Sequence, residues 1–88
     1  MARPSYAIWW TEGDGRRHAG KLELSPFHAL LAGSQGSRLA VPLDEIASVN
    51  YVLGGRLRLS RRRAAPICIG SLDAPGALLE LADVLRTA

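Results

Sequence analysis

Apolar and polar residues alternate with a period of two along most of this chain, up to about residue 69. The clearest case is the segment 56–59, where Arg56 and Arg58 face one side of an extended chain and two leucines face the other. Weaker alternation around Leu22 and Leu24 follows the same rule. Clusters of Gly, Pro and Ser separate these segments and read as turns. The pattern predicts about seven short antiparallel strands between residues 6 and 71.

A sharp corner interrupts the strands at residues 39–49. Leu39, Val41 and Leu43 place apolar side chains on one face. Pro42 cannot donate a ladder hydrogen bond, which suits an edge strand or the end of a strand. A single helical turn at the acidic pair that follows directs Ile46 at the same core. We expect a new strand to begin at about residue 48.

After residue 73 the period changes from two to about 3.6, which is typical of an amphipathic helix. The apolar stripe consists of Leu78, Leu81, Ala82 and Leu85. Leu79 and Val84 are expected to widen this stripe, and Asp73 is a reasonable N-cap. The sequence therefore predicts one C-terminal helix over about residues 74–87, with its apolar side against the sheet.

Two adjacent tryptophans lie in the first predicted strand. Successive side chains of a strand point to opposite faces, so Trp9 and Trp10 cannot both enter one core. One indole is then exposed, or it is covered by another part of the chain. An exposed aromatic residue is a candidate contact surface. The pattern does not distinguish which of the two faces outward.

Length and composition indicate one soluble globular domain spanning residues 1–88. Nearly half of the 88 residues are hydrophobic and 22% are charged, which argues against disorder. No apolar run approaches the length of a membrane span, and the first residues lack the apolar stretch of a signal peptide. We therefore expect a cytoplasmic protein. The single Cys68 lies in an apolar run, and we expect it to be a small buried residue.

Positive charge is unevenly distributed along the chain. The net charge is +3, and almost all basic residues are arginines, a bias that points to a GC-rich bacterial genome. The segment 54–72 contains no acid and five arginines, Arg56, Arg58, Arg61, Arg62 and Arg63. Such a cluster can attract phosphates or acidic surfaces, and the alternative is a solvated loop.

The order of seven strands and one terminal helix resembles the pleckstrin-homology (PH) superfold, and more closely its GRAM-like and bacterial PH-like branches. The resemblance covers nearly the whole chain, and the corner at residues 41–49 is its most distinctive part. It implies a mainly β fold, α+β by content. In this fold, antiparallel strands form a barrel of two near-orthogonal sheets capped by the C-terminal helix. It also implies a binding module for lipid head groups or proteins rather than an enzyme.

The resemblance also implies a place for an anionic lipid head group, at basic residues around the first hairpin. Arg16, Arg17 and Lys21 fall in this region. Glu23 departs from the family's pattern because it occupies the second basic position. Two further acids, Glu12 and Asp14, lie in the same turn and cancel part of the attraction. Lipid binding is therefore expected to be weak.

No arrangement of residues typical of catalysis is present in the sequence. His18, His28 and Cys68 do not have the spacing of a catalytic or metal-binding motif, so we expect no enzyme, no metal and no cofactor. The leading prediction is a protein-interaction or self-association module that uses the outward indole and a neighbouring sheet edge. The alternatives are weak anionic-lipid binding and nucleic-acid binding, the latter through the spare tryptophan and the arginines Arg56, Arg58, Arg61, Arg62 and Arg63.

Overall fold

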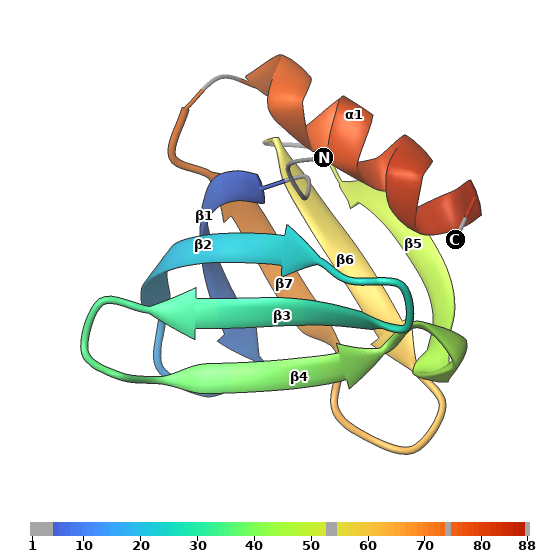
Figure 1. Cartoon of the computed structure of the whole chain (residues 1–88), viewed down its shortest axis with the longest axis horizontal. Helices are drawn as coiled ribbons and strands as arrows, with labels where there is room; N and C mark the ends of the chain where they lie inside the picture. The colour runs from blue at the N-terminus through green and yellow to red at the C-terminus, as the bar shows by residue number, and fades with distance from the viewer. Residues whose placement is uncertain (1–4, 53–54, 74, 88) are drawn as a thin grey trace.

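The computed structural model describes residues 5–52, 55–73 and 75–87. These residues form seven β-strands, one short 3₁₀ turn and one α-helix (Figure 1). The elements are β1 (Ser5–Glu12), β2 (His18–Leu24), β3 (His28–Gly33), β4 (Arg38–Pro42), η1 (Leu43–Glu45), β5 (Ile46–Val52), β6 (Arg56–Arg61), β7 (Ile67–Ser71) and α1 (Pro75–Thr87). The predicted mainly β fold with one C-terminal helix is therefore confirmed.

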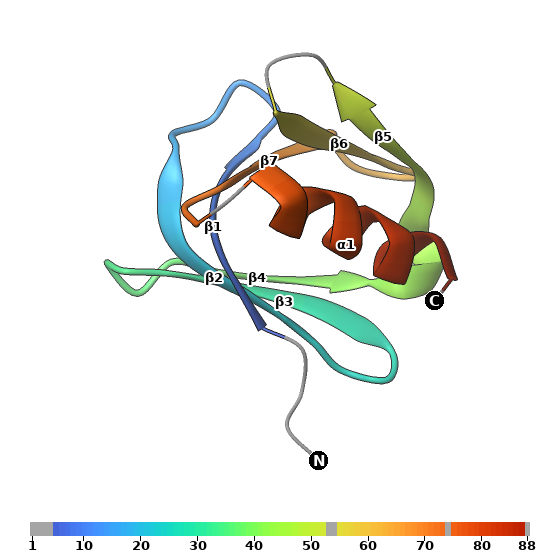
Figure 2. The same ribbon diagram turned by 90° about the horizontal axis from the view of Figure 1, so that it is seen from above.

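All seven strands belong to one antiparallel sheet, in the order β4-β3-β2-β1-β7-β6-β5. We expected two sheets, but β1 pairs with β2 on one side and with β7 on the other, so the ladder is continuous. The right-handed twist of the strands curls this sheet into a half-barrel. Figure 2 shows α1 lying across the concave side. The helix packs mainly against β5, β6 and β7.

The core is formed by the inward side chains of the strands and by the apolar stripe of α1. The predicted stripe is confirmed, since its four residues are all buried: Leu78, Leu81, Ala82 and Leu85. Leu79 is 55% exposed, so the stripe is narrower than predicted on that side. It follows Leu78 by about 100° around the helix axis, which turns its side chain away from the sheet. Val84 is half-buried against the core.

The corner between the two halves of the sheet is close to the prediction. Pro42 ends β4, which is an edge strand, and η1 then turns the chain. The next strand begins at Ile46 rather than at Ser48, because an irregularity in the β5–β6 register accommodates the bend between them. Ile46 is half-buried and packs against the core.

Two details of the prediction involve residues outside those that the structure describes. The turn expected at Gly54 and Gly55 includes Gly54, and the N-cap expected at Asp73 depends on Ala74. Neither is tested by the described residues. Within these residues, α1 is too short and too polar to cross a membrane.

Candidate functional site: the outer face of the sheet

The two tryptophans of β1 lie on opposite faces of the sheet, as predicted. Trp10 points inward and is 2% exposed, with its ring centroid 5.0 Å from that of His18. Trp9 points outward and is half-buried. The outward aromatic residue of the pair is therefore Trp9.

The Trp9 indole lies against the sheet because its neighbours in the adjacent strands are small. Ala19 of β2 and Gly70 of β7 are its cross-strand partners. A Cβ atom at Gly70 would overlap the indole ring, so only glycine leaves this space free. One face of the indole is consequently covered by backbone.

Two arginines complete this arrangement. The Arg17 guanidinium lies over the Trp9 ring, 4.0 Å from its centroid, and the Arg56 guanidinium lies 5.6 Å from it. Both distances are within the range of cation–π attraction. Since Gly70 occupies one face of the ring, Arg17 covers the face directed to solvent. We call Trp9, Arg17 and Arg56 the outer-face cluster.

The arginines of the outer-face cluster, Arg17 and Arg56, have no ion-pair partner within the part of the chain that the structure describes. Both line a depression of about 410 Å³ together with Trp9. One acid, Asp73, also lines this depression. The guanidinium groups are therefore available to an anionic partner.

Arg58 extends the basic surface along β6. It lies opposite Cys68 of β7 and lines a second depression, of about 530 Å³, with Thr11 and Asp14. Cys68 is half-buried, and it faces the outer side because its two isoleucine neighbours face the core. The expectation of a buried cysteine in the core is therefore wrong, since the alternation of the strand continues through this apolar run.

The basic residues of the first hairpin divide into two groups. Arg16 and Arg17 line a polar depression of about 350 Å³ with His18, between the β1–β2 turn and the β3–β4 turn. The facing turn contributes Ser34, Gln35 and Ser37. Lys21 is elsewhere, and its ammonium lies 2.6 Å from the carboxylate of Glu23. The hairpin therefore offers two of its three predicted basic residues to a ligand at this place.

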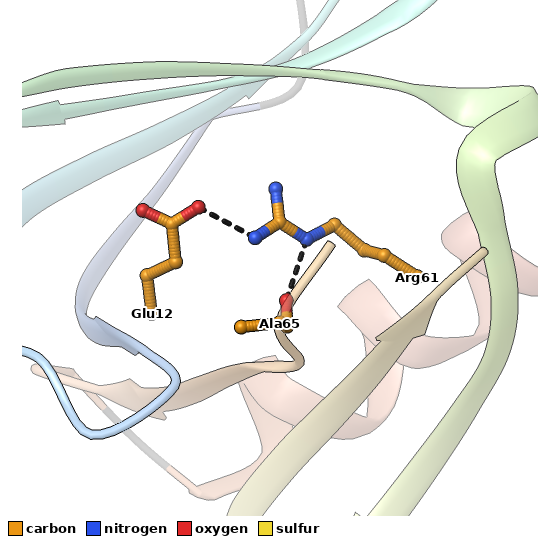
Figure 3. Close-up of polar contacts among 3 residues, drawn as sticks. All are labelled: Glu12, Arg61 and Ala65. Atoms are coloured by element: carbon orange, nitrogen blue, oxygen red, sulfur yellow. Dashed lines mark hydrogen bonds and ion pairs between the residues drawn. The ribbon is translucent and has the colours of Figure 1, made fainter. Parts of the chain in front are cut away.

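Arg61 connects β6 to two other parts of the chain through polar contacts (Figure 3). Its Nη2 donates to Oε2 of Glu12 at 2.5 Å, and its Nε donates to the carbonyl oxygen of Ala65 at 2.7 Å. The Arg61 side chain is only 8% exposed. The ion pair also neutralises Glu12, one of the two acids that we expected to weaken anion binding at the first hairpin.

The remaining arginines of the basic segment lie in the β6–β7 loop. Arg62 donates from Nε to the carbonyl oxygen of Asp44 at 3.1 Å, and Arg63 is exposed. The five arginines of residues 54–72 therefore do not form one surface. Arg56 and Arg58 point outward from β6, whereas Arg61 and Arg62 hold the loop in place.

The outward indole and the sheet edges are separate features. Trp9 lies on β1, the central strand, and each edge strand is three positions away in the sheet. The expected surface that combines the indole with an edge is therefore not formed within one copy of the chain. Among the described residues, no three His, Cys, Asp or Glu side chains lie close enough together to hold a metal ion.

No family model matches this chain, and no curated protein matches it significantly. Among solved structures, it is similar to the C-terminal domain of an unknown protein from Leishmania infantum. The TM-score is 0.76 at 16% identity, and the match covers 94% of this chain and 82% of that chain. At this identity the likeness shows the fold alone. The curled seven-stranded half-barrel with its C-terminal helix fits a PH-like or other small-barrel fold.

Proposed function

We propose that this protein is a non-catalytic, PH-like binding module that recognises an acidic segment of a protein partner through the outer-face cluster. The observation that supports this proposal is the pair of guanidinium groups held at Trp9 without ion pairs among the described residues. Arginine presents a planar fork of donors that matches a carboxylate in a bidentate manner. Stacking on the indole limits the rotamers of Arg17, so less conformational entropy is lost on binding.

Carboxylates of an extended peptide also match the spacing of the arginines on β6. Arg56 and Arg58 are two residues apart on one face of the strand, a separation of about 7 Å. Acidic residues at alternate positions of an extended segment have the same separation. A protein partner is favoured over a nucleic acid because Gly70 and Arg17 cover the two faces of Trp9, which leaves no ring face for a base to stack on.

A second candidate function is the binding of a phosphate-bearing lipid head group, as in PH and GRAM-like domains. It is favoured by the polar depression at the first hairpin, whose lining contains Arg16, Arg17 and His18 but no acid. The ion pair of Glu12 with Arg61 removes part of the opposing charge. The site remains a second candidate because Lys21 is paired with Glu23 and does not line this depression.

Fluorescence anisotropy tests the first proposal with a labelled peptide of alternating Glu and Ala and a control peptide of alternating Gln and Ala. We expect the acidic peptide alone to bind, with an affinity that falls as salt is added. Arg56→Gln and Arg58→Gln should each weaken binding several-fold. Arg63→Gln is the matched control, because it removes the same charge from the exposed loop and should change affinity much less. Equal losses in all three variants would show only nonspecific charge attraction.

Two further ligands separate this proposal from the alternatives. Tight binding of a single-stranded oligonucleotide that Arg56→Gln abolishes, without peptide binding, would replace the protein partner by a nucleic acid. Binding of vesicles that contain phosphoinositides, lost in Arg16→Gln but retained in Arg58→Gln, would establish the second candidate. Arg16 and Arg58 line different depressions, so the two variants report on different places.

A further inference from the structure

The edge strand β4 has backbone groups that no other described strand uses. Two hydrogen bonds fix which residues of β4 face β3, because Gly33 N–H donates to Ser37 O at 2.6 Å and Leu43 N–H donates to Phe27 O at 2.9 Å. In an antiparallel ladder the residues bonded to a neighbour alternate along the strand. The odd-numbered residues from 37 to 43 therefore bond to β3. Arg38, Ala40 and Pro42 direct their backbone groups away from the sheet.

At the opposite edge of the sheet, the helix uses one backbone acceptor of β5. Arg86 of α1 donates from Nε and Nη2 to the carbonyl oxygen of Val49 in β5, at 3.3 and 3.1 Å. This bond occupies an acceptor in the middle of β5, and α1 packs beside it. Among the described strands, β4 has only β3 as a neighbour, and Figure 1 shows it at the other edge of the sheet. The described residues show no such contact to the outward backbone groups of β4, so this edge is open to a second strand.

We propose that β4 pairs with β4 of a second copy of this chain, antiparallel and about a two-fold axis at Ala40. In this register Ala40 lies opposite Ala40, and Arg38 lies opposite Pro42. The outward N–H donors of each edge belong to Arg38 and Ala40, since proline has none. Each Ala40 N–H then meets the Ala40 carbonyl of the other copy, and each Arg38 N–H meets the Pro42 carbonyl. All outward donors of both β4 edges are satisfied, which unpaired edges do not achieve.

Charge disfavours one of the two neighbouring registers. A shift by two residues that brings Arg38 opposite Ala40 would place Arg38 of one copy diagonally beside Arg38 of the other, where like charges repel. In the proposed register the two arginines lie at opposite ends of the paired strands. Each is then close to η1 of the other copy, which carries Asp44. Neither Arg38 nor Asp44 forms an ion pair among the described residues, so two reciprocal pairs can form between copies.

The side chains at this edge also permit a close approach. Ala40 is exposed and small, so it does not hinder a second strand. An apolar depression of about 350 Å³ lies beside it, with Leu30 and Ala32 in its lining. Because the strand has five residues, the interface is small and the dimer dissociates on dilution. This proposal is independent of the proposed function.

Sedimentation velocity from low micromolar to near-millimolar protein tests the dimer. The wild type should show a mass that rises from one copy toward two copies. Ala40→Pro removes the outward N–H without removing a bond to β3, and it should stay monomeric at all concentrations. Ala40→Ser is the matched control and should dimerise like the wild type. A wild type that stays monomeric throughout, or a folded Ala40→Pro variant that still dimerises, would overturn the proposal.

Exchanging the charges of Arg38 and Asp44 gives an independent test of the dimer. This test is informative even if Ala40→Pro fails to fold. Arg38→Asp and Asp44→Arg should each weaken dimerisation at least several-fold, because each places like charges together across the two-fold axis. The double variant restores opposite charges and should recover much of the wild-type dimerisation constant. Single variants that dimerise as the wild type does, or a double variant weaker than both single ones, would contradict the proposed register.

Discussion

The ion pair between Glu12 and Arg61 should respond unequally to the loss of its two partners. The Arg61 side chain is 8% exposed, whereas the Glu12 side chain is 46% exposed. Removing the carboxylate leaves a nearly buried guanidinium without its counter-charge. Removing the guanidinium leaves a carboxylate that water can solvate. The burial of each partner, rather than the distance between them, therefore decides the cost of each substitution.

The two costs follow from this difference in burial. Breaking a buried pair by removing one partner costs about 3–5 kcal/mol, and the partial exposure of Glu12 lowers this to about 2–3 kcal/mol for Glu12→Gln. Arg61→Met replaces the buried charge by an apolar chain of similar length. It also loses the hydrogen bond to Ala65, whose carbonyl belongs to an exposed residue, so we expect a cost of about 1 kcal/mol.

Urea unfolding of the wild type, the two single variants and the double variant measures these costs. Each change in the free energy of unfolding follows from the shift in the transition midpoint, with one m-value used for all four proteins. The double variant should be about as stable as Arg61→Met, because Glu12→Gln costs little once the buried charge is gone. A shift of about 1 kcal/mol corresponds to about 4–8 °C in melting temperature for a domain of this size. If Arg61→Met proved more destabilising than Glu12→Gln, the argument from the buried charge would be refuted.

Three further predictions concern the core, the outer face and the stability of the fold at alkaline pH. Leu81→Ala should lower the free energy of unfolding by about 2–4 kcal/mol in urea titrations, and Ile46→Ala by less, because Ile46 is only half-buried. An equal or larger loss at Ile46 would contradict this order. Gly70→Ala should displace the indole above it and shift tryptophan fluorescence, and an unchanged spectrum would refute the contact. Burial, and then the charge and hydrogen bond of Glu80, raise the pKa of Tyr6 above 10.0. The folded state then holds its proton longer than the unfolded state, so stability should fall as pH rises above about 10, and less steeply in Tyr6→Phe.

The strands and the helix could be predicted from the sequence because their burial follows a local period. Leu57 and Leu59 are buried on either side of the exposed Arg58, and Leu81 lies on the predicted stripe of α1. A one-residue shift would have exposed these leucines, so the hydrophobic effect fixes the register of each element. The orientation of the Cys68 side chain could not be predicted from composition, because this residue lies in an apolar run and still faces outward.

The candidate site could be predicted only in part because it combines residues that are distant in sequence. Alternation places Trp9 and Trp10 on opposite faces but does not distinguish the faces. The outward position of Trp9 depends on Gly70, a cross-strand partner that no local pattern indicates. The approach of Arg56 to the indole depends on the same long-range pairing. The structural role of Arg61 could not be predicted either, because its ion-pair partner Glu12 lies on another strand.

The pairing of β1 with β7 has a consequence for how fast this chain reaches its native state. The 54 residues between Glu12 and Ile67 separate the two paired segments, whereas the other strand pairs join neighbours in the chain. Hairpins between neighbours form early, because closing a short loop costs little entropy. We therefore expect the two sets of consecutive strands, β1–β4 and β5–β7, to form first. The pairing of β1 with β7 should then form in the rate-limiting step. Substitutions in these two paired strands should slow refolding, whereas those at the β3–β4 hairpin should mainly accelerate unfolding.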